Sequence, residues 1–381
     1  MNNPRSQLEI LKQDKWLTAC LTWIPIVLAV TIWAIFSQGI ARDLPIGVVD
    51  LSHSRASRSL INHFNASPTL NVTEYYADSL NAKNALVESE VYAYVVIPKD
   101  FDKQLTKQTL PQVTTFYNSQ YILIGRLISS AVVQSTGYFN ASIETGKQLA
   151  KGNQVLNAAM GKAVPIRTQI TPLFNLNTNY AQFLVSAIVP AIWQIGIVVG
   201  TIMILAANHR ATNHSLQQWL GERPVTTVAT LLSRYFVVFA LQGVLFLIWF
   251  YHWLDWPQHG ALWIVALAQW FTIIACMIMG SLFYFITLDP ARALSFAGAY
   301  TAPSFAFMGI TFPVTDMGFL AQAWRNLLPV SHYIEVQVAQ TSYGLTFAQT
   351  MTHLIPMFGY LIPLAVITLI IKKQTHKEQF A

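Results

Sequence analysis

Charged residues are scarce in this sequence, and cysteine is almost absent. Asp, Glu, Lys and Arg make up 10% of the 381 residues, hydrophobic residues make up 54%, and the mean hydropathy is +0.42. This balance excludes an ordinary soluble protein and indicates an integral membrane protein. The only two cysteines, Cys20 and Cys276, both fall in apolar runs, so they cannot cross-link a domain outside the membrane.

Motifs that would support nucleotide or metal chemistry are missing too. Gly146-Lys147 and Gly161-Lys162 lack both the upstream glycine and the following hydroxyl residue of a P-loop, so the chain does not hydrolyse nucleotide by this route. No H-E-x-x-H, paired C-x-x-C or G-x-S-x-G segment occurs. We therefore expect no catalytic residue, no metal site and no cofactor bound by this chain. His209 and His214 share a loop, where we interpret them as solvated side chains.

Long apolar runs predict six membrane-spanning helices. The first, residues 16–37, exceeds the roughly 7 to 15 apolar residues of a signal peptide, so we interpret it as a retained anchor. The segment before it, residues 1–15, predicts a short cytoplasmic interfacial helix. The other five spans form a transmembrane block at residues 180–371, with runs at 181–207, 225–253, 261–288, 293–312 and 353–371.

Basic residues flank these runs on one side of the predicted membrane. The net charge of +6 therefore follows from topology and does not indicate a nucleic-acid partner. Because Lys and Arg mark cytoplasmic flanks, both termini, including the tail 372–381, and the loop 208–224 are predicted to be cytoplasmic. Residues 38–179 then lie outside the cytoplasm, and residues 313–352 form an outer re-entrant segment. The flanking basic residues are Arg5, Lys12, Lys15, Arg210, Arg223, Arg292, Lys372, Lys373 and Lys377.

Residues 38–179 have the patterning of an α/β domain. Alternating or β-branched runs predict strands at 45–50, 70–76, 91–97, 112–117 and 164–170. Helices are predicted at 55–64, 79–88 and 101–107, with one or two long helices between 120 and 160. The predicted fold is a polytopic α-helical membrane protein with six transmembrane helices and an inserted extracytoplasmic α/β domain.

Ionisable residues inside the predicted spans are few. Arg234 lies in the cytoplasmic third of the third span, and Asp289 and Arg292 bracket Pro290 in a tight cytoplasmic hairpin. We interpret these side chains as pairing or snorkelling at the interface. A proton-coupled carrier would need a buried carboxylate relay, and the sequence shows none. A transport role would therefore draw its energy from a partner protein.

Several short segments resemble those of a known family. Val48-Val49-Asp50 precedes Ser-rich residues, and Val95-Val96-Ile97-Pro98-x-x-Phe101 follows. Later come Phe305-x-Phe307-x-Gly309-x-x-Phe312-Pro313 and Leu327-Leu328-Pro329-x-x-His332-Tyr333. In order and placement, these segments resemble bacterial type-2 ABC exporter permeases, in the subfamily with a large periplasmic domain between the first and second transmembrane helices. The resemblance covers nearly the whole chain.

This resemblance implies two functional regions. One is an outer gate at Phe307, Gly309, Phe312, Pro313, Pro329, His332 and Tyr333. The other is a coupling helix in the loop 208–224, where Leu216, Trp219 and Leu220 would be apolar anchors in a groove on an ATPase, and Glu222 and Arg223 would orient the helix. The loop lacks the acidic, Gly-Thr-containing stretch that is common in the family. Whether it still engages an ATPase, or belongs to a degenerate subunit beside a better-preserved partner, stays open.

The resemblance also implies a function and partners. The chain would be a permease subunit in the bacterial inner membrane, with ATP and Mg²⁺ on separate ABC ATPase subunits. A second copy or a paralogue would complete the pathway, and a periplasmic membrane-fusion adaptor is a further partner that the layout allows. Aromatic-rich spans with few buried charges favour an amphipathic or apolar substrate, as in multidrug efflux. The alternative is a cell-envelope scaffold or receptor whose outer domain binds a partner.

Overall fold

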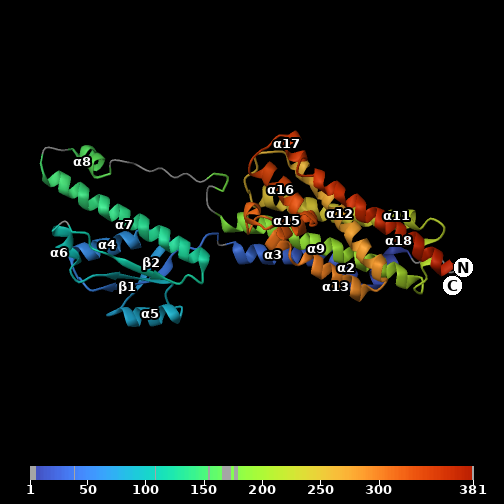
Figure 1. Cartoon of the computed structure of the whole chain (residues 1–381), viewed down its shortest axis with the longest axis horizontal. Coiled ribbons are helices and arrows are strands. Elements are labelled where there is room, and N and C mark those ends of the chain that lie inside the picture. The colour runs from blue at the N-terminus through green and yellow to red at the C-terminus, as the bar shows by residue number, and fades with distance from the viewer. Residues whose placement is uncertain are drawn as a thin grey trace. The chain divides into compact units, whose positions relative to one another are not determined.

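The chain consists of two compact units, each with its own core. The computed structural model describes residues 6–37, 39–107, 109–152, 155–164, 173–175 and 179–379. The membrane unit comprises Met1–Gly39 and Pro172–Ala381, and the insert unit comprises Ile40–Thr171 (Figure 1).

A four-stranded sheet forms the centre of the insert unit, in the order β2-β1-β3-β4. Strand β1 (Leu44–Asp50) pairs in parallel with β2 (Leu70–Tyr75) and β3 (Ala93–Ile97), and β4 (Thr114–Tyr117) pairs antiparallel with β3. β1 and β3 are the central strands and are almost wholly buried, as their continuous apolar runs predict. The predicted strand at 164–170 lies outside the described residues apart from Val164, which is not in a strand.

Helices cover both faces of this sheet. α4 (Arg55–Asn65) and α7 (Ile122–Ala150) lie on one face and α5 (Ser79–Val87) on the other, as Figure 1 shows. Leu60, Phe64 and Phe139 pack with the first face, and Ala82 packs with Val49 on the second. The short helices α6 (Phe101–Thr106) and α8 (Leu156–Ala163) complete the unit.

Four helices of the membrane unit are long and apolar enough to cross a bilayer among the described residues. They are α9 (Tyr180–Ala211), α11 (Pro224–Ile248) with its π-helical extension η1 (Trp249–Trp253), α12 (Leu262–Thr287) and α18 (Leu361–Gln379) with the turns that precede it. α2 (Lys15–Leu21) and α3 (Trp23–Phe36) make a fifth span if the pair counts as one, although it bends by 49°. The short helix α1 (Gln7–Gln13) precedes them.

The predicted span at 293–312 is not one continuous helix. α13 (Pro290–Thr301) ends before Pro303, and only the four-residue α14 (Ser304–Phe307) follows. Twelve residues of helix extend about 18 Å, well short of the roughly 30 Å hydrocarbon core. By length and composition, four or five spans are identified among the described residues, and a sixth is not confirmed. The chain continues through η2 (Val314–Asp316), α15 (Phe319–Asn326), α16 (Pro329–Thr341), α17 (Phe347–Met351) and η3 (Ile355–Tyr360).

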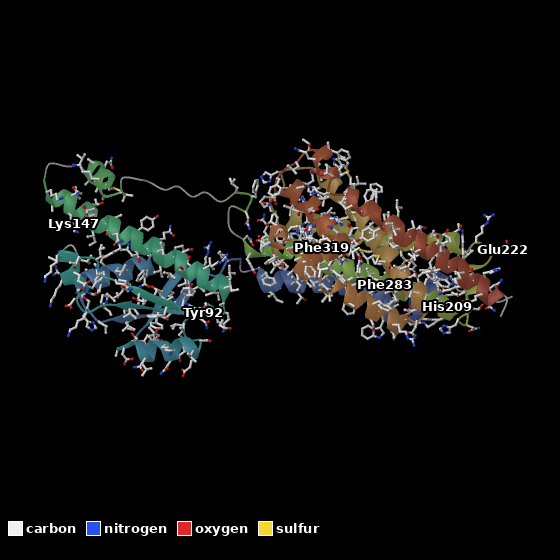
Figure 2. All side chains as sticks on the ribbon, in the orientation of Figure 1. Tyr92, Lys147, His209, Glu222, Phe283 and Phe319 are labelled. Carbon is white, nitrogen blue, oxygen red and sulfur yellow. The ribbon has the colours of Figure 1, made fainter. Side chains whose placement is uncertain are left out.

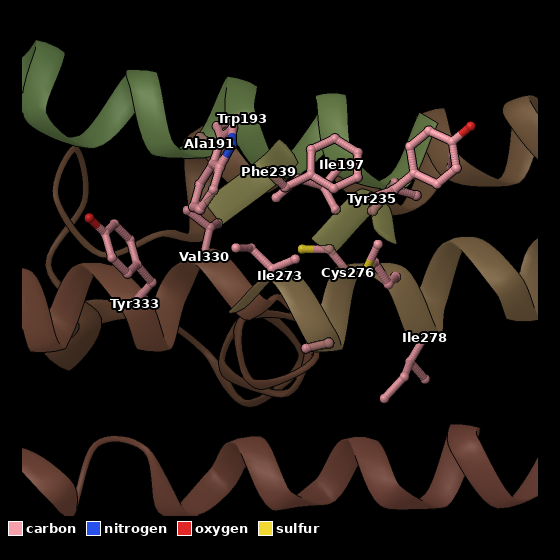
Figure 3. Close-up of a cluster of buried hydrophobic side chains, with 14 of the residues drawn as sticks. Ala191, Trp193, Ile197, Tyr235, Phe239, Ile273, Cys276, Ile278, Val330 and Tyr333 are labelled. Atoms are coloured by element: carbon pink, nitrogen blue, oxygen red, sulfur yellow. The ribbon is translucent and has the colours of Figure 1, made fainter. Parts of the chain in front are cut away.

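One apolar core joins the long helices. Figure 3 shows Trp193 of α9, Phe239 of α11, Cys276 of α12 and Val330 of α16 packed into it. Gly200 of α9 lets the helices approach closely, because an added Cβ would stand 3.1 Å from the Phe239 ring. Small residues at such crossings are typical of membrane helix packing.

Glutamine side chains satisfy the backbone groups that helix breaks leave free. Pro190 lies inside α9 and cannot donate to the Ser186 carbonyl, which instead accepts a hydrogen bond from Gln337 Nε2 at 2.9 Å. The Ala261 amide, at the start of α12, donates to Gln340 Oε1 at 2.9 Å. Both glutamines are buried. A membrane interior offers no water to these groups, so the glutamines stabilise helix ends that hydrocarbon would not tolerate.

Candidate functional site

The predicted coupling loop forms a short, well-capped helix. α10 (Leu216–Leu220) begins at Ser215, whose hydroxyl accepts from the Gln218 amide at 3.3 Å. It ends at Gly221, whose φ of +62° is readily adopted only by glycine, and Pro224 then starts α11. Local sequence thus fixes both ends of the helix.

The three predicted apolar anchors pack against the protein's own helices. Leu216 and Leu220 are 4% and 2% exposed and belong to the core of the membrane unit. The Trp219 ring stacks on His209 and on Phe285, with centroid distances of 5.7 and 6.1 Å. In this structure Leu216 and Leu220 are therefore covered by the protein itself and Trp219 is half-buried, and their entry into a groove on an ATPase stays a prediction. The exposed surface around α10 includes instead Gln217, Gln218, Glu222 and Arg223.

His209 is buried, which corrects its interpretation as a solvated side chain. Its Nδ1 atom lies 2.8 Å from the Tyr284 hydroxyl, and its ring lies edge-on to His214 at 5.2 Å. His214 is exposed, as predicted. Figure 2 shows His209 and Glu222 at one end of the membrane unit and Phe319 toward the opposite end.

Polar contacts connect the N-terminal helix α1 and the residue that follows it to α9 and α11 near this loop. Gln7 of α1 donates to Asn208 Oδ1 at 2.7 Å and accepts from the Tyr235 hydroxyl at 3.0 Å. Asp14 forms an ion pair with Arg210 at 2.7 Å. The short N-terminal helix is thus bound to both α9 and α11.

The predicted hairpin residues serve as a helix cap. Asp289 Oδ1 accepts from the Arg292 amide at 2.8 Å, so the carboxylate caps α13 next to Pro290. The Arg292 side chain is exposed, and no ion pair joins it to Asp289 among the described residues.

The predicted gate residues fall into an exposed group and a buried group. Phe312 and Pro313 are exposed and Phe307 is half-buried. Gly309 has a φ of +89°, and a Cβ there would stand 2.8 Å from Val314 Cγ2. Pro329, His332 and Tyr333 are buried in α16. The segment at 305–313 therefore contains a turn at Gly309, and the segment at 327–333 leads into the buried helix α16.

Gln194 connects the segment at 305–313 to the segment at 327–333 through their flanking residues. Its Oε1 atom accepts from the Val330 amide at 2.8 Å, in the first turn of α16, and its Nε2 atom donates to Ser304 Oγ at 2.9 Å, at the start of α14. The hydroxyls of Tyr300 and Tyr360 both donate to the Leu327 carbonyl. The broken region between α13 and α16 is therefore held by side chains from α9, α13 and the turn before α18.

An ion-pair cluster that the sequence analysis did not single out lies beside the gate residues. Arg325, only 5% exposed, contacts Glu335 at 2.6 Å, and His353 Nδ1 lies 3.4 Å from the other Glu335 oxygen. His332 Nε2 lies 3.1 Å from the Asn326 carbonyl, and burial lowers the pKa of His332. The sequence could have indicated this cluster, because Arg325 and Glu335 lie ten residues apart in a segment otherwise poor in charge.

Metal chemistry has no support in the described part of the chain. No group of three or more His, Cys, Asp or Glu side chains there lies close enough to hold an ion.

The long apolar helices indicate a multi-pass membrane protein. A model of the family described as ABC-2 family transporter protein matches residues 15–371, and the chain belongs to this family. Comparison with curated proteins and with solved structures gives no significant match. Permeases of this family are membrane transport subunits that typically work with ABC ATPases, so the family indicates a permease-type transport subunit.

Proposed function

We propose that the chain is the permease subunit of an ATP-driven exporter that moves amphipathic or apolar molecules, drug-like ones included, out of the cytoplasm or the membrane. Two permease chains, identical or paralogous, would form the pathway, and ATP and Mg²⁺ would bind to separate ATPase subunits. The termini would be cytoplasmic, and residues 38–179 would lie in the periplasm, where they can hand substrate to a membrane-fusion adaptor. A bacterial inner membrane fits this arrangement.

The observation that carries the proposal is the packing of α10 against the helices of the membrane unit. Its apolar side chains pack into the membrane unit, so force applied to the exposed side of α10 reaches α9 through His209 and α12 through Phe285. Two buried leucines and a stacked tryptophan fix the position of α10 on these helices. We therefore assign ATPase docking to the exposed polar side chains of the loop, with Glu222 and Arg223 as the charged pair.

Docking is tested by charge reversal. Glu222→Lys should reduce the amount of ATPase subunit that copurifies with the permease, because it changes an exposed carboxylate by two charge units. Asp316→Lys makes the same change at an exposed position in η2, away from the loop, and should have no effect. Equal copurification by both variants and the parent chain would contradict the assignment.

Transport is tested in vesicles that contain the permease and its ATPase. ATP should drive movement of an amphipathic fluorescent dye, and neutralising the catalytic carboxylate of the ATPase subunit should abolish it. Unchanged dye movement with the inactive ATPase would exclude ATP-driven export.

A groove of about 1440 Å³ in the insert unit favours a second candidate, a receptor or scaffold whose outer domain binds a partner. Phe101 and Phe139 line it, with Glu144 and Lys147 also present. In that case, substitutions in this groove would abolish function while changes at α10 would leave it intact.

A further inference from the structure

Two adjoining hollows lie beside α10, between α11 and α18. The first measures about 860 Å³ and is lined by polar and charged residues of the loop, the first turn of α11 and the last turns of α18. The second measures about 420 Å³ and runs between α11, α12 and α18. Val225 and Thr368 line both hollows, so a single ligand can occupy them together.

The polar hollow has the chemistry of an anion site. Arg223 and Lys372 line it, and neither forms an ion pair with a carboxylate among the described side chains. His376 is a further lining residue, and Glu222 brings one carboxylate that a bound anion must avoid. The first turn of the 25-residue α11 also faces this hollow through Val225 and Thr226, where the helix dipole favours negative charge.

The adjoining groove presents almost only hydrocarbon. Side chains such as Val228, Leu232 and Ile367 line it. Its three hydroxyls are satisfied within their own helices: Ser233 donates to the Thr230 carbonyl at 2.9 Å, Ser281 to Met277 at 2.7 Å, and Thr368 to Ala365 at 2.7 Å. A polar ligand would find no donor or acceptor in need of a partner there, whereas an acyl chain fits.

We propose that this pair of hollows binds an anionic phospholipid, with its phosphate between Arg223 and Lys372 and an acyl chain along the groove of α11, α12 and α18. Charge complementarity at one end and hydrocarbon at the other require an amphipathic anion, and basic pockets between membrane helices are typical headgroup sites. Because Gln217 and Gly221 of the loop also line the headgroup hollow, the lipid bridges α10 to α18. The site shares Arg223 with the docking surface proposed above, but the lipid measurements use the permease chain alone.

The headgroup half is tested with the full chain purified in detergent. Native mass spectrometry would compare retention of dioleoyl phosphatidylglycerol and dioleoyl phosphatidylcholine. The double variant Arg223→Gln, Lys372→Gln should retain less phosphatidylglycerol, by about fivefold for each basic residue removed. The pair Lys373→Gln, Lys377→Gln removes the same charge from exposed positions that do not line the hollow, and should retain phosphatidylglycerol as the parent does.

The acyl half is tested by filling the groove. Ala229→Trp should reduce phosphatidylglycerol retention, because Ala229 lines the groove, whereas Ala365→Trp places the same side chain on an exposed position of α18 outside it. Melting curves and size-exclusion profiles would show that each variant is folded.

Three outcomes would overturn the proposal. One is an equal loss of phosphatidylglycerol in the two double variants, which would indicate adsorption of the lipid to any surface cation. Another is equal retention of phosphatidylcholine and phosphatidylglycerol. The third is a covalent dimer formed by Ser233→Cys in native membranes and absent from the parent chain, which would show that a second copy covers the groove.

Discussion

Gln242 of α11 donates from Nε2 to the Leu21 carbonyl of α2 at 2.7 Å. That carbonyl would normally accept from residue 25, but Pro25 has no amide hydrogen. The same glutamine accepts from Trp193 Nε1 at 3.2 Å, so one buried side chain binds α2, α9 and α11 together at the bend of the first span.

Replacing this glutamine should destabilise the membrane unit. Gln242→Leu leaves the Leu21 carbonyl and the Trp193 indole without partners, at a cost of about 1–3 kcal/mol. Thermal unfolding in detergent would measure the loss. In a Pro25→Ala background the backbone amide gained at this position can donate to the Leu21 carbonyl, so Gln242→Leu should cost about 1 kcal/mol less. An identical loss in both backgrounds would mean that the contact with Leu21 contributes nothing.

Glu335 should be critical because it neutralises buried Arg325. Removing one partner of a buried ion pair costs about 3–5 kcal/mol, and because Glu335 is partly exposed we expect about 2–3 kcal/mol for Glu335→Gln. The melting temperature should fall accordingly, while Asp316→Asn, at an exposed carboxylate without an ion pair among the described residues, should leave it unchanged. Replacing both Arg325 and Glu335 by leucine should cost less than Glu335→Gln, and a larger loss would show that the pair itself is strongly stabilising.

Gly309 should tolerate no side chain. Its φ of +89° and the approach of Val314 Cγ2 to 2.8 Å from a Cβ make Gly309→Ala destabilising by about 1–2 kcal/mol. Gly318→Ala is a matched control, because Gly318 has a φ of −67° and an added Cβ would have no atom within 4 Å. The melting temperatures of the two variants should differ by several degrees, and equal values would remove the case for a strained turn.

Trp219→Ala should separate docking from coupling. The loss of two ring stacks weakens the connection between α10 and the spans by roughly 1–3 kcal/mol, but the exposed docking surface remains. The ATPase should therefore copurify as before, while dye-stimulated ATP hydrolysis per bound ATPase falls severalfold. Trp263→Ala, which removes the Trp263–Phe347 stack at 5.6 Å, should leave both measurements unchanged. Full stimulation in Trp219→Ala would favour the receptor function.

Hydropathy predicted the long helices because a spanning run needs only length and few charges. It could not show where a run breaks. Residues 293–312 contain no charged side chain, but α13 ends before Pro303 and Gly309 adopts a positive φ, so the run is not one helix. In the insert unit, the strands β1 and β3 were predictable because their apolar runs are bounded by turn residues.

The site was less predictable because sequence shows which face of a helix is apolar but not what covers it. The sequence around Leu216 and Leu220 fits anchors for a partner and core residues equally well. Only the structure places these side chains against the protein's own spans. Gln194 and Gln337 gave no signal, because their partners are 136 and 151 residues away in the chain.

The buried glutamines have a consequence for how the protein responds to acidity. A carboxamide both donates and accepts hydrogen bonds and carries no charge at any physiological pH. The contacts that hold Leu21, Ser186, Ser304 and Val330 therefore do not titrate. Any dependence of transport on proton concentration would therefore have to originate outside these glutamine contacts, which keep their hydrogen bonds in acid and in base.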